Sequence, residues 1–237
     1  MIGAAVRQHL LDALRTSPSI NEPFPHTYVT DTFPDTFYSR LIASLPPAHV
    51  YVPLRDTGRV RGPYPPQRTV IFLNETDALA RIPEATRPLW AEMQRWLTGP
   101  AVVGAVLERF RAEIAALVNA ASVSVYAEVQ LVRDYPGYAI GPHTDVRHEL
   151  AAMVMYLALD SKRPWLGTSL YVPRNQFLTC EGGPHYGPEA FVRESTLDYS
   201  PNRLFAFPKT NRCFHGVERF DEPDAVRDVL LWMVYRA

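Results

Sequence analysis

Apolar residues recur at helical spacing in the first half of the chain and at strand spacing in the second. In 89–97 they repeat every three or four positions behind Pro88, which suits a first helical turn, and a second such repeat covers 103–117. Gly99-Pro100 separates the two repeats, so the pattern predicts two helices. Their Trp and Phe stripes are interpreted as core packing, which would cover one face of a β core.

The second half contains short apolar segments bounded by Gly, Pro, Asn or Asp. An alternating stretch begins at Tyr126 and meets a Tyr-Pro-Gly turn at 135–137, and 149–159 is almost continuously apolar. Shorter segments occupy 167–172, 201–207, 213–218 and 227–235. This pattern is typical of strands joined by turns. We therefore predict an α+β chain that is mainly β.

Length and composition favour one domain. The chain has 237 residues, of which 47% are hydrophobic and 21% charged, enough for one substantial core. We expect 1–237 to form a single domain, with 1–120 mainly helical support plus a lead-in strand and 122–237 the β core. The proline-rich stretch 57–67 is expected to be a loop.

Charge, cysteine content and hydropathy exclude several classes. The net charge is −1 without a Lys/Arg block, which argues against a nucleic-acid partner. Two cysteines are too few for a disulfide framework, and no apolar stretch approaches the roughly 20 residues of a membrane helix. We expect a soluble, cytoplasmic protein without a membrane partner. The sequence leaves its oligomeric state open.

His143-Thr144-Asp145 and His215 form the strongest chemical signal. Residues i and i+2 of an extended strand point to the same face, so His143 and Asp145 can reach one ion together. His215 would complete the site from a neighbouring strand. Two imidazoles and one carboxylate on one face of an octahedron leave three positions open, as a non-haem Fe(II) oxygenase requires. A lone His-x-Asp triplet is a weak motif, so the surrounding strands carry the prediction.

Arg227 begins a strand that otherwise consists of apolar residues. A guanidinium in such surroundings needs an anionic partner, and a carboxylate can accept two parallel hydrogen bonds from it. Arg219 is closer to His215 in sequence and is the alternative.

Taken together, these segments resemble the 2-oxoglutarate and Fe(II)-dependent dioxygenases, in particular their prolyl-hydroxylase-like bacterial branch. The His-x-Asp motif, a Gly-led strand at 167–172, Pro-Asn-Arg-Leu-Phe-Ala-Phe at 201–207, His-Gly-Val at 215–217 and Arg227 occur here in the family's order. The resemblance extends over 22–236, and its specific motifs lie in 126–235.

The resemblance implies a double-stranded β-helix (jelly-roll) core with N-terminal supporting helices. It further implies Fe(II) held by His143, Asp145 and His215, with 2-oxoglutarate and O₂ as co-substrates. Arg227 and Tyr156 would hold the distal carboxylate of 2-oxoglutarate, and Tyr135 matches a further cofactor position less cleanly. Many members carry Ser where this chain has Val229. Because Asp145 is retained, halogenation is disfavoured.

The implied reaction hydroxylates an unactivated C–H bond and releases succinate and CO₂. A small polar substrate, amino-acid-like or a natural-product intermediate, is our first hypothesis, with 172–200 as its lid and Arg147, Arg174 and His185 as its contacts. The alternative is that these three residues lie in solvent-exposed loops and have no role in substrate binding. A peptidyl or prolyl hydroxylase is the second hypothesis. A non-catalytic jelly-roll metal- or ligand-binding protein is the third, from a different class.

Overall fold

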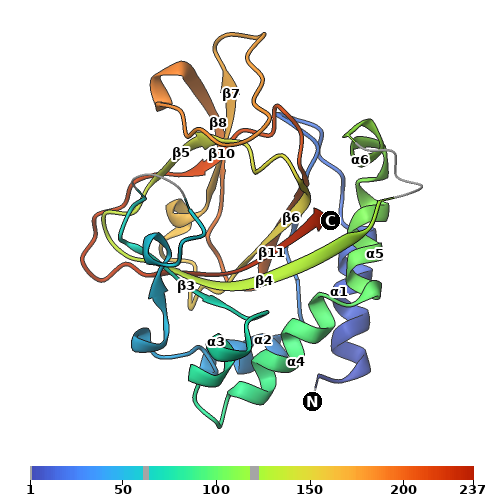
Figure 1. Ribbon diagram of the computed structural model, residues 1–237, viewed down its shortest axis with the longest axis vertical. Coiled ribbons are helices and arrows are strands. Elements are labelled where there is room, and N and C mark those ends of the chain that lie inside the picture. The colour runs from blue at the N-terminus through green and yellow to red at the C-terminus, as the bar shows by residue number, and fades with distance from the viewer. Residues whose placement is uncertain (1, 61–63, 118–122) are drawn as a thin grey trace.

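The computed structural model describes residues 2–60, 64–117 and 123–237. Two antiparallel sheets face each other across the interior (Figure 1). The core strands are β4 (Val125–Asp134), β5 (Ile140–His143), β6 (Glu149–Tyr156), β7 (Thr168–Pro173), β8 (Phe191–Leu197), β9 (Arg203–Pro208), β10 (His215–Val217) and β11 (Arg227–Arg236). Three strands precede them: β1 (Thr27–Val29), β2 (Val52–Pro53) and β3 (Arg68–Phe72).

The strand order confirms the expected jelly-roll. The larger sheet has the order β1-β9-β6-β11-β4-β3-β2, and the smaller has the order β5-β10-β7-β8. From β4 to β11 the chain passes repeatedly between the two sheets, so each sheet contains four of the eight core strands, as in a double-stranded β-helix.

The helices lie on the outer side of the larger sheet, opposite the smaller sheet (Figure 1). They are α1 (Ala4–Thr16), α2 (Asp35–Ala43), α3 (Thr76–Arg81), α4 (Arg87–Leu97), α5 (Pro100–Arg109) and α6 (Arg111–Leu117). Four 3-10 turns complete the regular structure: η1 (Ala48–Val50), η2 (Leu54–Asp56), η3 (Pro164–Leu166) and η4 (Pro188–Ala190). The helix predicted over 103–117 is divided at Phe110, whose backbone leaves helical geometry at φ −113° and ψ 29°.

Alternating side chains give the larger sheet two different faces. On β11, Leu230, Trp232 and Val234 pack against the helices, whereas Val229 and Met233 belong to the interior cluster between the sheets. The Trp232 indole Nε1 donates a hydrogen bond to the carbonyl of Leu97 at 2.8 Å, which joins this strand to the end of α4. The helical half and the β half therefore share one hydrophobic core.

Strand β3 was not predicted from the sequence, although its pairing matters for the site. It aligns Arg68 opposite Asp134 of β4, and Arg227 of β11 lies opposite Asp134 on the other side. The boundary expected at 120–122 lies outside the described residues, as do 61–63 of the expected loop at 57–67.

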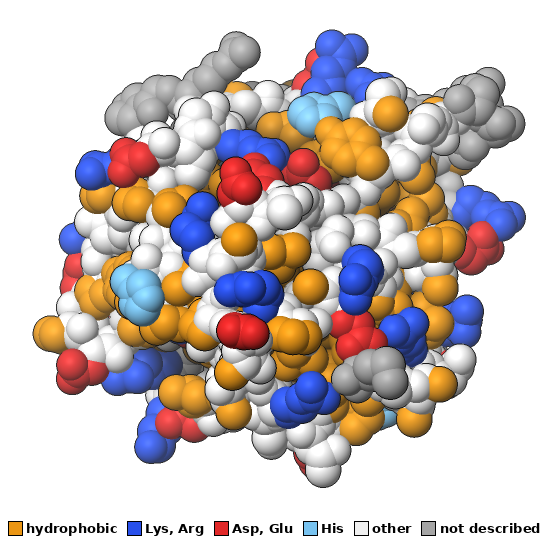
Figure 2. Space-filling view, turned by 60° about the horizontal axis from the view of Figure 1, so that its bottom comes forward, with side chains coloured by type: hydrophobic (Ala, Val, Ile, Leu, Met, Phe, Trp, Pro, Cys, Tyr) orange, Lys and Arg blue, Asp and Glu red, His pale blue; other side chains and the backbone are white. Residues whose placement is uncertain are grey.

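On the face shown in Figure 2, basic and acidic side chains are interspersed. Among the described residues, no helix has the length and apolar character needed to cross a bilayer.

Candidate metal centre and its cavity

The three predicted metal ligands come together at the edge of the smaller sheet. His143 ends β5 and lies directly opposite His215 of β10, and Asp145 follows two residues after His143. The Asp145 Oδ1 atom lies 3.9 Å from Nε2 of His143 and 3.6 Å from Nε2 of His215. One potential ligand atom from each residue lies within 4.8 Å of the others, so the three can share one ion.

Backbone carbonyls fix which nitrogen of each imidazole is free. Nδ1 of His143 lies 2.9 Å from the carbonyl of Gly141, and Nδ1 of His215 lies 2.9 Å from the carbonyl of Cys213. Because a carbonyl only accepts, each Nδ1 must carry the proton and each Nε2 presents its lone pair. This is the usual arrangement of a metal-binding histidine.

The electrostatics of the three residues also suit a cation. Burial, assisted by the neighbouring His215, lowers the pKa of His143 to about 3. Burial lowers the pKa of His215 to about 4, so both imidazoles are neutral at physiological pH. Burial raises the pKa of Asp145, whose Oδ2 atom is buried without a hydrogen-bond partner among the described residues. Two free imidazole nitrogens beside an unpartnered carboxylate fit a divalent metal with nitrogen and oxygen ligands.

The three residues open into a cavity of about 300 Å³ between the sheets. Such a volume is at the lower end of the range for small-molecule sites, roughly 300–1,000 Å³. Apolar side chains from both sheets form most of its wall, and polar side chains gather at Arg68 and Arg227 and also near Glu149. The other polar or charged lining residues are Tyr64, Gln130, Thr144, Thr168, His185 and Tyr235.

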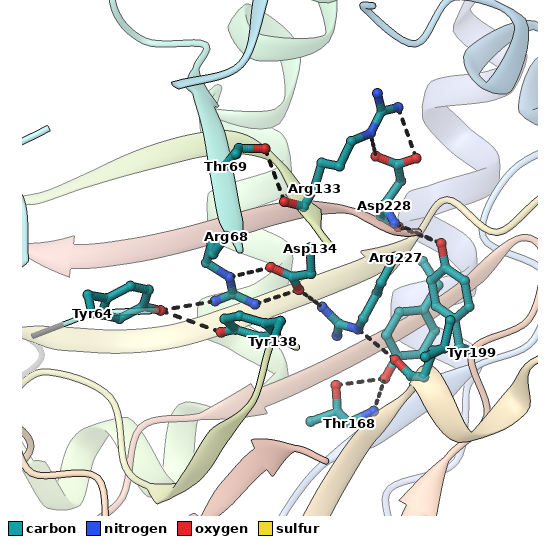
Figure 3. A network of polar contacts seen from close by, with 12 residues as sticks. Tyr64, Arg68, Thr69, Arg133, Asp134, Tyr138, Thr168, Tyr199, Arg227 and Asp228 are labelled. Atoms are coloured by element: carbon teal, nitrogen blue, oxygen red, sulfur yellow. Dashed lines mark hydrogen bonds and ion pairs between the residues drawn. The ribbon is translucent and has the colours of Figure 1, made fainter. Parts of the chain in front are cut away.

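Two arginines and one aspartate form a buried charged cluster in the cavity wall. Asp134 lies between the two guanidinium groups (Figure 3). It accepts 2.7 and 2.9 Å hydrogen bonds from Nε and Nη2 of Arg68 and a 2.9 Å bond from Nη1 of Arg227. Burial opposes the charge on Arg68, but Asp134 outweighs that effect, and the pKa of Arg68 lies well above its usual value. Two cations and one anion leave a formal charge of +1 at this end of the cavity.

Arg227 therefore already has the anionic partner that its apolar strand requires. Its side chain is 2% exposed, and its Nε also donates to the carbonyl of Leu166 at 2.6 Å. A protein carboxylate meets the requirement inferred from sequence, so a bound ligand is not needed to explain the burial of Arg227. The cluster still has one uncompensated positive charge, which an anionic ligand can neutralise.

Tyr156 lies beside this cluster without being part of the described cavity lining. Its hydroxyl donates to Thr168 Oγ1 at 2.8 Å and accepts from the Thr168 backbone N–H at 3.1 Å. Burial raises the pKa of Tyr156, while Arg227 acts in the opposite direction. Tyr156 thus holds Thr168, which does line the cavity.

Two residues considered at the sequence level lie away from the cavity. Arg219 is exposed and pairs with Asp221, with Nη2 2.8 Å from Oδ1. Tyr135 is not among the described lining residues, and it interacts electrostatically with Arg133 and Tyr51 instead.

Of the three expected substrate contacts, the structure brings only His185 to the metal residues. The His185 ring lies 4.9 Å from that of His143, centroid to centroid. Arg147 is exposed and lies 3.5 Å from Glu181, and it lines a neighbouring cavity. Arg174 is exposed and donates from Nε to the carbonyl of Glu189 at 3.1 Å.

The expected lid at 172–200 contains more core structure than predicted. Residues 191–197 form β8, which pairs with β7 and completes the smaller sheet. Within the connecting segment, the carbonyl of Cys180 accepts a 2.8 Å bond from Thr144 Oγ1, and Tyr186 N–H donates to the Pro142 carbonyl at 2.9 Å. Gly182 has φ +120° and approaches the Asp145 backbone closely, where a Cβ atom would lie 2.4 Å from its carbonyl oxygen. This segment therefore supports the metal residues directly.

Sequence reasoning missed Arg68 and Glu149. Arg68 carries the same signal as Arg227, a charged residue at the start of an apolar run, in this case Thr-Val-Ile-Phe. Glu149 begins the apolar strand β6 in the same way. Both signals were visible in the sequence.

Neither a family model nor a curated protein matches this sequence. The fold does match solved structures. A prolyl hydroxylase from Trichoplax adhaerens, in complex with a hypoxia inducible factor peptide fragment, aligns with 97% of this chain and 88% of its own, at 12% identity and a TM-score of 0.53. A 2OG-Fe(II) oxygenase family oxidoreductase from Burkholderia pseudomallei aligns with 100% of this chain and 93% of its own, at 11% identity and a TM-score of 0.53.

The non-haem alpha ketoglutarate dependent carbocyclase SnoK of nogalamycin biosynthesis gives a third match. It covers 98% of this chain and 87% of its own, at 15% identity and a TM-score of 0.52. The chain thus has the jelly-roll fold of the 2-oxoglutarate and Fe(II)-dependent oxygenases.

Proposed function

We propose that the protein is an Fe(II) and 2-oxoglutarate-dependent dioxygenase that hydroxylates a small polar molecule. The observation that carries this proposal is one cavity lined both by a His-Asp-His cluster with free Nε2 atoms and by a cationic cluster. His143, Asp145 and His215 would hold the iron. The fold of known 2-oxoglutarate oxygenases supports the same proposal.

Arg227 is the proposed anchor for the distal carboxylate of 2-oxoglutarate. Arg68 shares Asp134 with Arg227 and adds a second positive charge at this end of the cavity. One bound carboxylate neutralises the formal +1 of the cluster. Thr168, held by Tyr156, offers a hydroxyl in the same cavity. Arg227 is favoured over Arg219 because Arg219 is exposed and lies outside the described lining.

In the proposed reaction, 2-oxoglutarate, O₂ and a substrate C–H bond give succinate, CO₂ and a C–OH group. Bound iron supplies the activation of O₂ and the oxidation of the C–H bond. The protein's own contribution is positional. His143 and His215 are kept neutral and correctly protonated by backbone carbonyls, the arginine cluster orients an anion, and the apolar walls exclude water.

The size of the site favours a small substrate over a peptide. The cavity has about 300 Å³, and the segment containing His185 packs over the metal residues. A peptide substrate is the alternative, because the structure of the Trichoplax enzyme is a complex with a peptide fragment. The cytoplasmic location and the absence of a nucleic-acid partner stay predictions from the sequence.

A screen of succinate release tests the proposal. The protein is incubated under air with Fe(II), 2-oxoglutarate and a library of small polar metabolites, with a peptide panel in parallel. We expect succinate above background with members of the metabolite library, and none from the Asp145→Ala variant. Succinate release with peptides alone would support the prolyl-hydroxylase alternative, and no release with either set would favour a binding protein.

A further inference from the structure

The cavity contains a second polar end, eight positions along β11 from Arg227. There Tyr235 lies opposite Glu149 of β6, whereas Gln130 of β4 lies opposite Leu231, between this end and Arg227. All three side chains line the same cavity as the metal residues. Among the described residues, none of the three makes a side-chain hydrogen bond, whereas Arg68 and Arg227 both donate to Asp134.

Glu149 is the most informative of these residues. It is 4% exposed; among the described residues its backbone N–H donates to the carbonyl of Val146 at 3.0 Å, whereas its carboxyl group makes no hydrogen bond. Burial and repulsion from Asp145 raise its pKa well above the usual range, and Lys209 opposes this shift. A buried carboxyl group without a partner costs free energy unless a ligand supplies a donor or a cation.

The nearby cation Lys209 does not fill this role. Its Nζ already donates to the carbonyl of Thr210 at 3.0 Å, to Asn211 Oδ1 at 3.2 Å and to the carbonyl of Cys180 at 3.4 Å. No ion pair joins Lys209 to Glu149 within the described parts of the chain. Glu149 thus lines the cavity of the metal residues, and also the neighbouring cavity, with the capacity of its carboxyl group to accept hydrogen bonds unused.

The surroundings of Glu149 suit a positively charged nitrogen. The Tyr235 ring, which lies 5.3 Å from that of Tyr126 and 5.1 Å from that of His148, forms part of the cavity wall beside Met233. Aromatic faces and carboxylates are the groups that bind ammonium ions in proteins.

We propose that Glu149, with Tyr235, binds a protonated amino group of the substrate and so positions the substrate across the metal residues. This proposal rests on the proposed function and narrows its substrate class to amines. An ammonium ion at this position stabilises the ionised carboxylate of Glu149, and the cavity then has two anchors of opposite sign. The arginine cluster holds the anionic co-substrate, and Glu149 holds the cationic end of the substrate.

Matched pairs of small ligands test this inference without knowledge of the substrate. Phenethylamine and 2-phenylethanol, and hexylamine and hexanol, differ essentially in the charged nitrogen. Their Kd values are measured by calorimetry on the anaerobic Fe(II)–2-oxoglutarate protein and on the metal-free protein. For the parent we expect at least one amine to bind ten or more times more tightly than its alcohol.

The preference for amines should disappear in Glu149→Gln and persist, reduced, in Glu149→Asp, which keeps the charge. Glu181→Gln is the matched control, because Glu181 is an exposed acid that lines only the neighbouring cavity among those described. It should leave the preference unchanged. Equal or unmeasurable binding of amines and alcohols to the parent, or a preference that survives in Glu149→Gln, would overturn the assignment.

Failure of this inference is distinguishable from failure of the proposed function. The visible absorption band of the anaerobic Fe(II)–2-oxoglutarate complex reports the proposed function and should be retained in Glu149→Gln. A parent protein that forms the band and shows no preference for amines refutes only the substrate class. A parent protein that lacks the band and still prefers amines refutes the oxygenase proposal and keeps the amine site.

Discussion

The two polar ends of the cavity differ in how their charges are balanced. At the arginine end, Asp134 binds both Arg68 and Arg227 with geometry that satisfies the carboxylate fully. At the other end, the carboxyl group of Glu149, which is 4% exposed, makes no side-chain hydrogen bond to the described residues. Both ends lie on the same face of the larger sheet and share strand β11, and Asp134 and Glu149 are both buried.

We interpret the arginine end as a charge network that is already formed without a ligand, and Glu149 as a group whose partner is a ligand. Burying a charge costs free energy unless the charge is paired. The hydrogen bonds to Asp134 hold Arg68 and Arg227 in place, and the remaining positive charge of the cluster attracts one anion. A lone buried acid stabilises little by itself and gains most when a ligand arrives. We therefore expect substitutions at the arginine end to reduce stability and co-substrate binding together, and substitutions at Glu149 to change ligand preference alone.

The largest expected effect is that of Asp134→Asn. Removing this charge leaves two buried guanidinium groups facing each other, and breaking a buried pair typically costs about 3–5 kcal/mol. For a chain of this size, that loss corresponds to a fall in Tm of roughly 6–20 °C. Thermal unfolding followed by circular dichroism measures it.

Asp221→Asn is the matched control for Asp134→Asn, since Asp221 pairs with an arginine on the surface. It should change stability by no more than about 0.5 kcal/mol. Equal effects of the two variants would mean that the buried cluster does not stabilise the fold in the way described.

Arg227→Gln should weaken 2-oxoglutarate binding by about 2–5 kcal/mol, at least roughly thirtyfold in Kd. Arg68→Gln should weaken it in the same direction, because both guanidinium groups line the cavity. Titration of 2-oxoglutarate into the anaerobic Fe(II) protein measures both. Iron affinity should change little, since neither residue is a proposed ligand.

Arg219→Gln is the control for this titration, because Arg219 is exposed and paired with Asp221. If it abolished binding while Arg227→Gln bound as tightly as the parent, the anchor would be Arg219.

Tyr156→Phe should have a smaller effect, near 1 kcal/mol on the stability of the fold. The hydroxyl is bonded to Thr168 on both its donor and acceptor sides, so the variant loses the support of Thr168 and no direct contact with the cavity. Chemical denaturation measures the change. A loss of 2-oxoglutarate affinity as large as that of Arg227→Gln would instead assign Tyr156 a direct role in binding.

The smallest expected effect on stability is that of Glu149→Gln. Because the carboxyl group has no described hydrogen-bond partner, the neutral amide should leave the free energy of unfolding within about 0.5 kcal/mol of the parent value or raise it. The same denaturation experiment measures it. A loss above about 2 kcal/mol would show that Glu149 stabilises the fold and would break the contrast with the arginine end.

Much of the fold could be predicted because periodicity and turn residues are local signals. Six of the eight core strands correspond to apolar segments recognised in the sequence, and the extended backbone expected at His143 corresponds to β5. Strand β8 was missed because its exposed pattern, with polar residues at 193–196, has the composition of a loop. Pairing with β7 determines its structure, and such pairing is not visible in a single sequence.

The metal cluster could be predicted because His143 and Asp145 are only two residues apart, although strand β5 ends at His143, and β10 brings His215 opposite His143. The residues of the cavity wall could not be predicted, because they depend on the register in which the strands pair. Arg68 and Arg227 are far apart in sequence and meet only because β3 and β11 both align with Asp134. The position of Arg227 at the start of an apolar strand indicated that it needs an anionic partner. It did not indicate that this partner is Asp134.

The central claim is that His143, Asp145 and His215 hold one Fe(II) to which 2-oxoglutarate binds. Anaerobic addition of Fe(II) and 2-oxoglutarate should produce a visible metal-to-ligand charge-transfer band in the parent. We expect the band to be abolished in His143→Ala and in His215→Ala and retained in His148→Ala, whose imidazole lies beside Tyr235. A band unchanged in both of the first two variants would contradict the assignment of the metal centre.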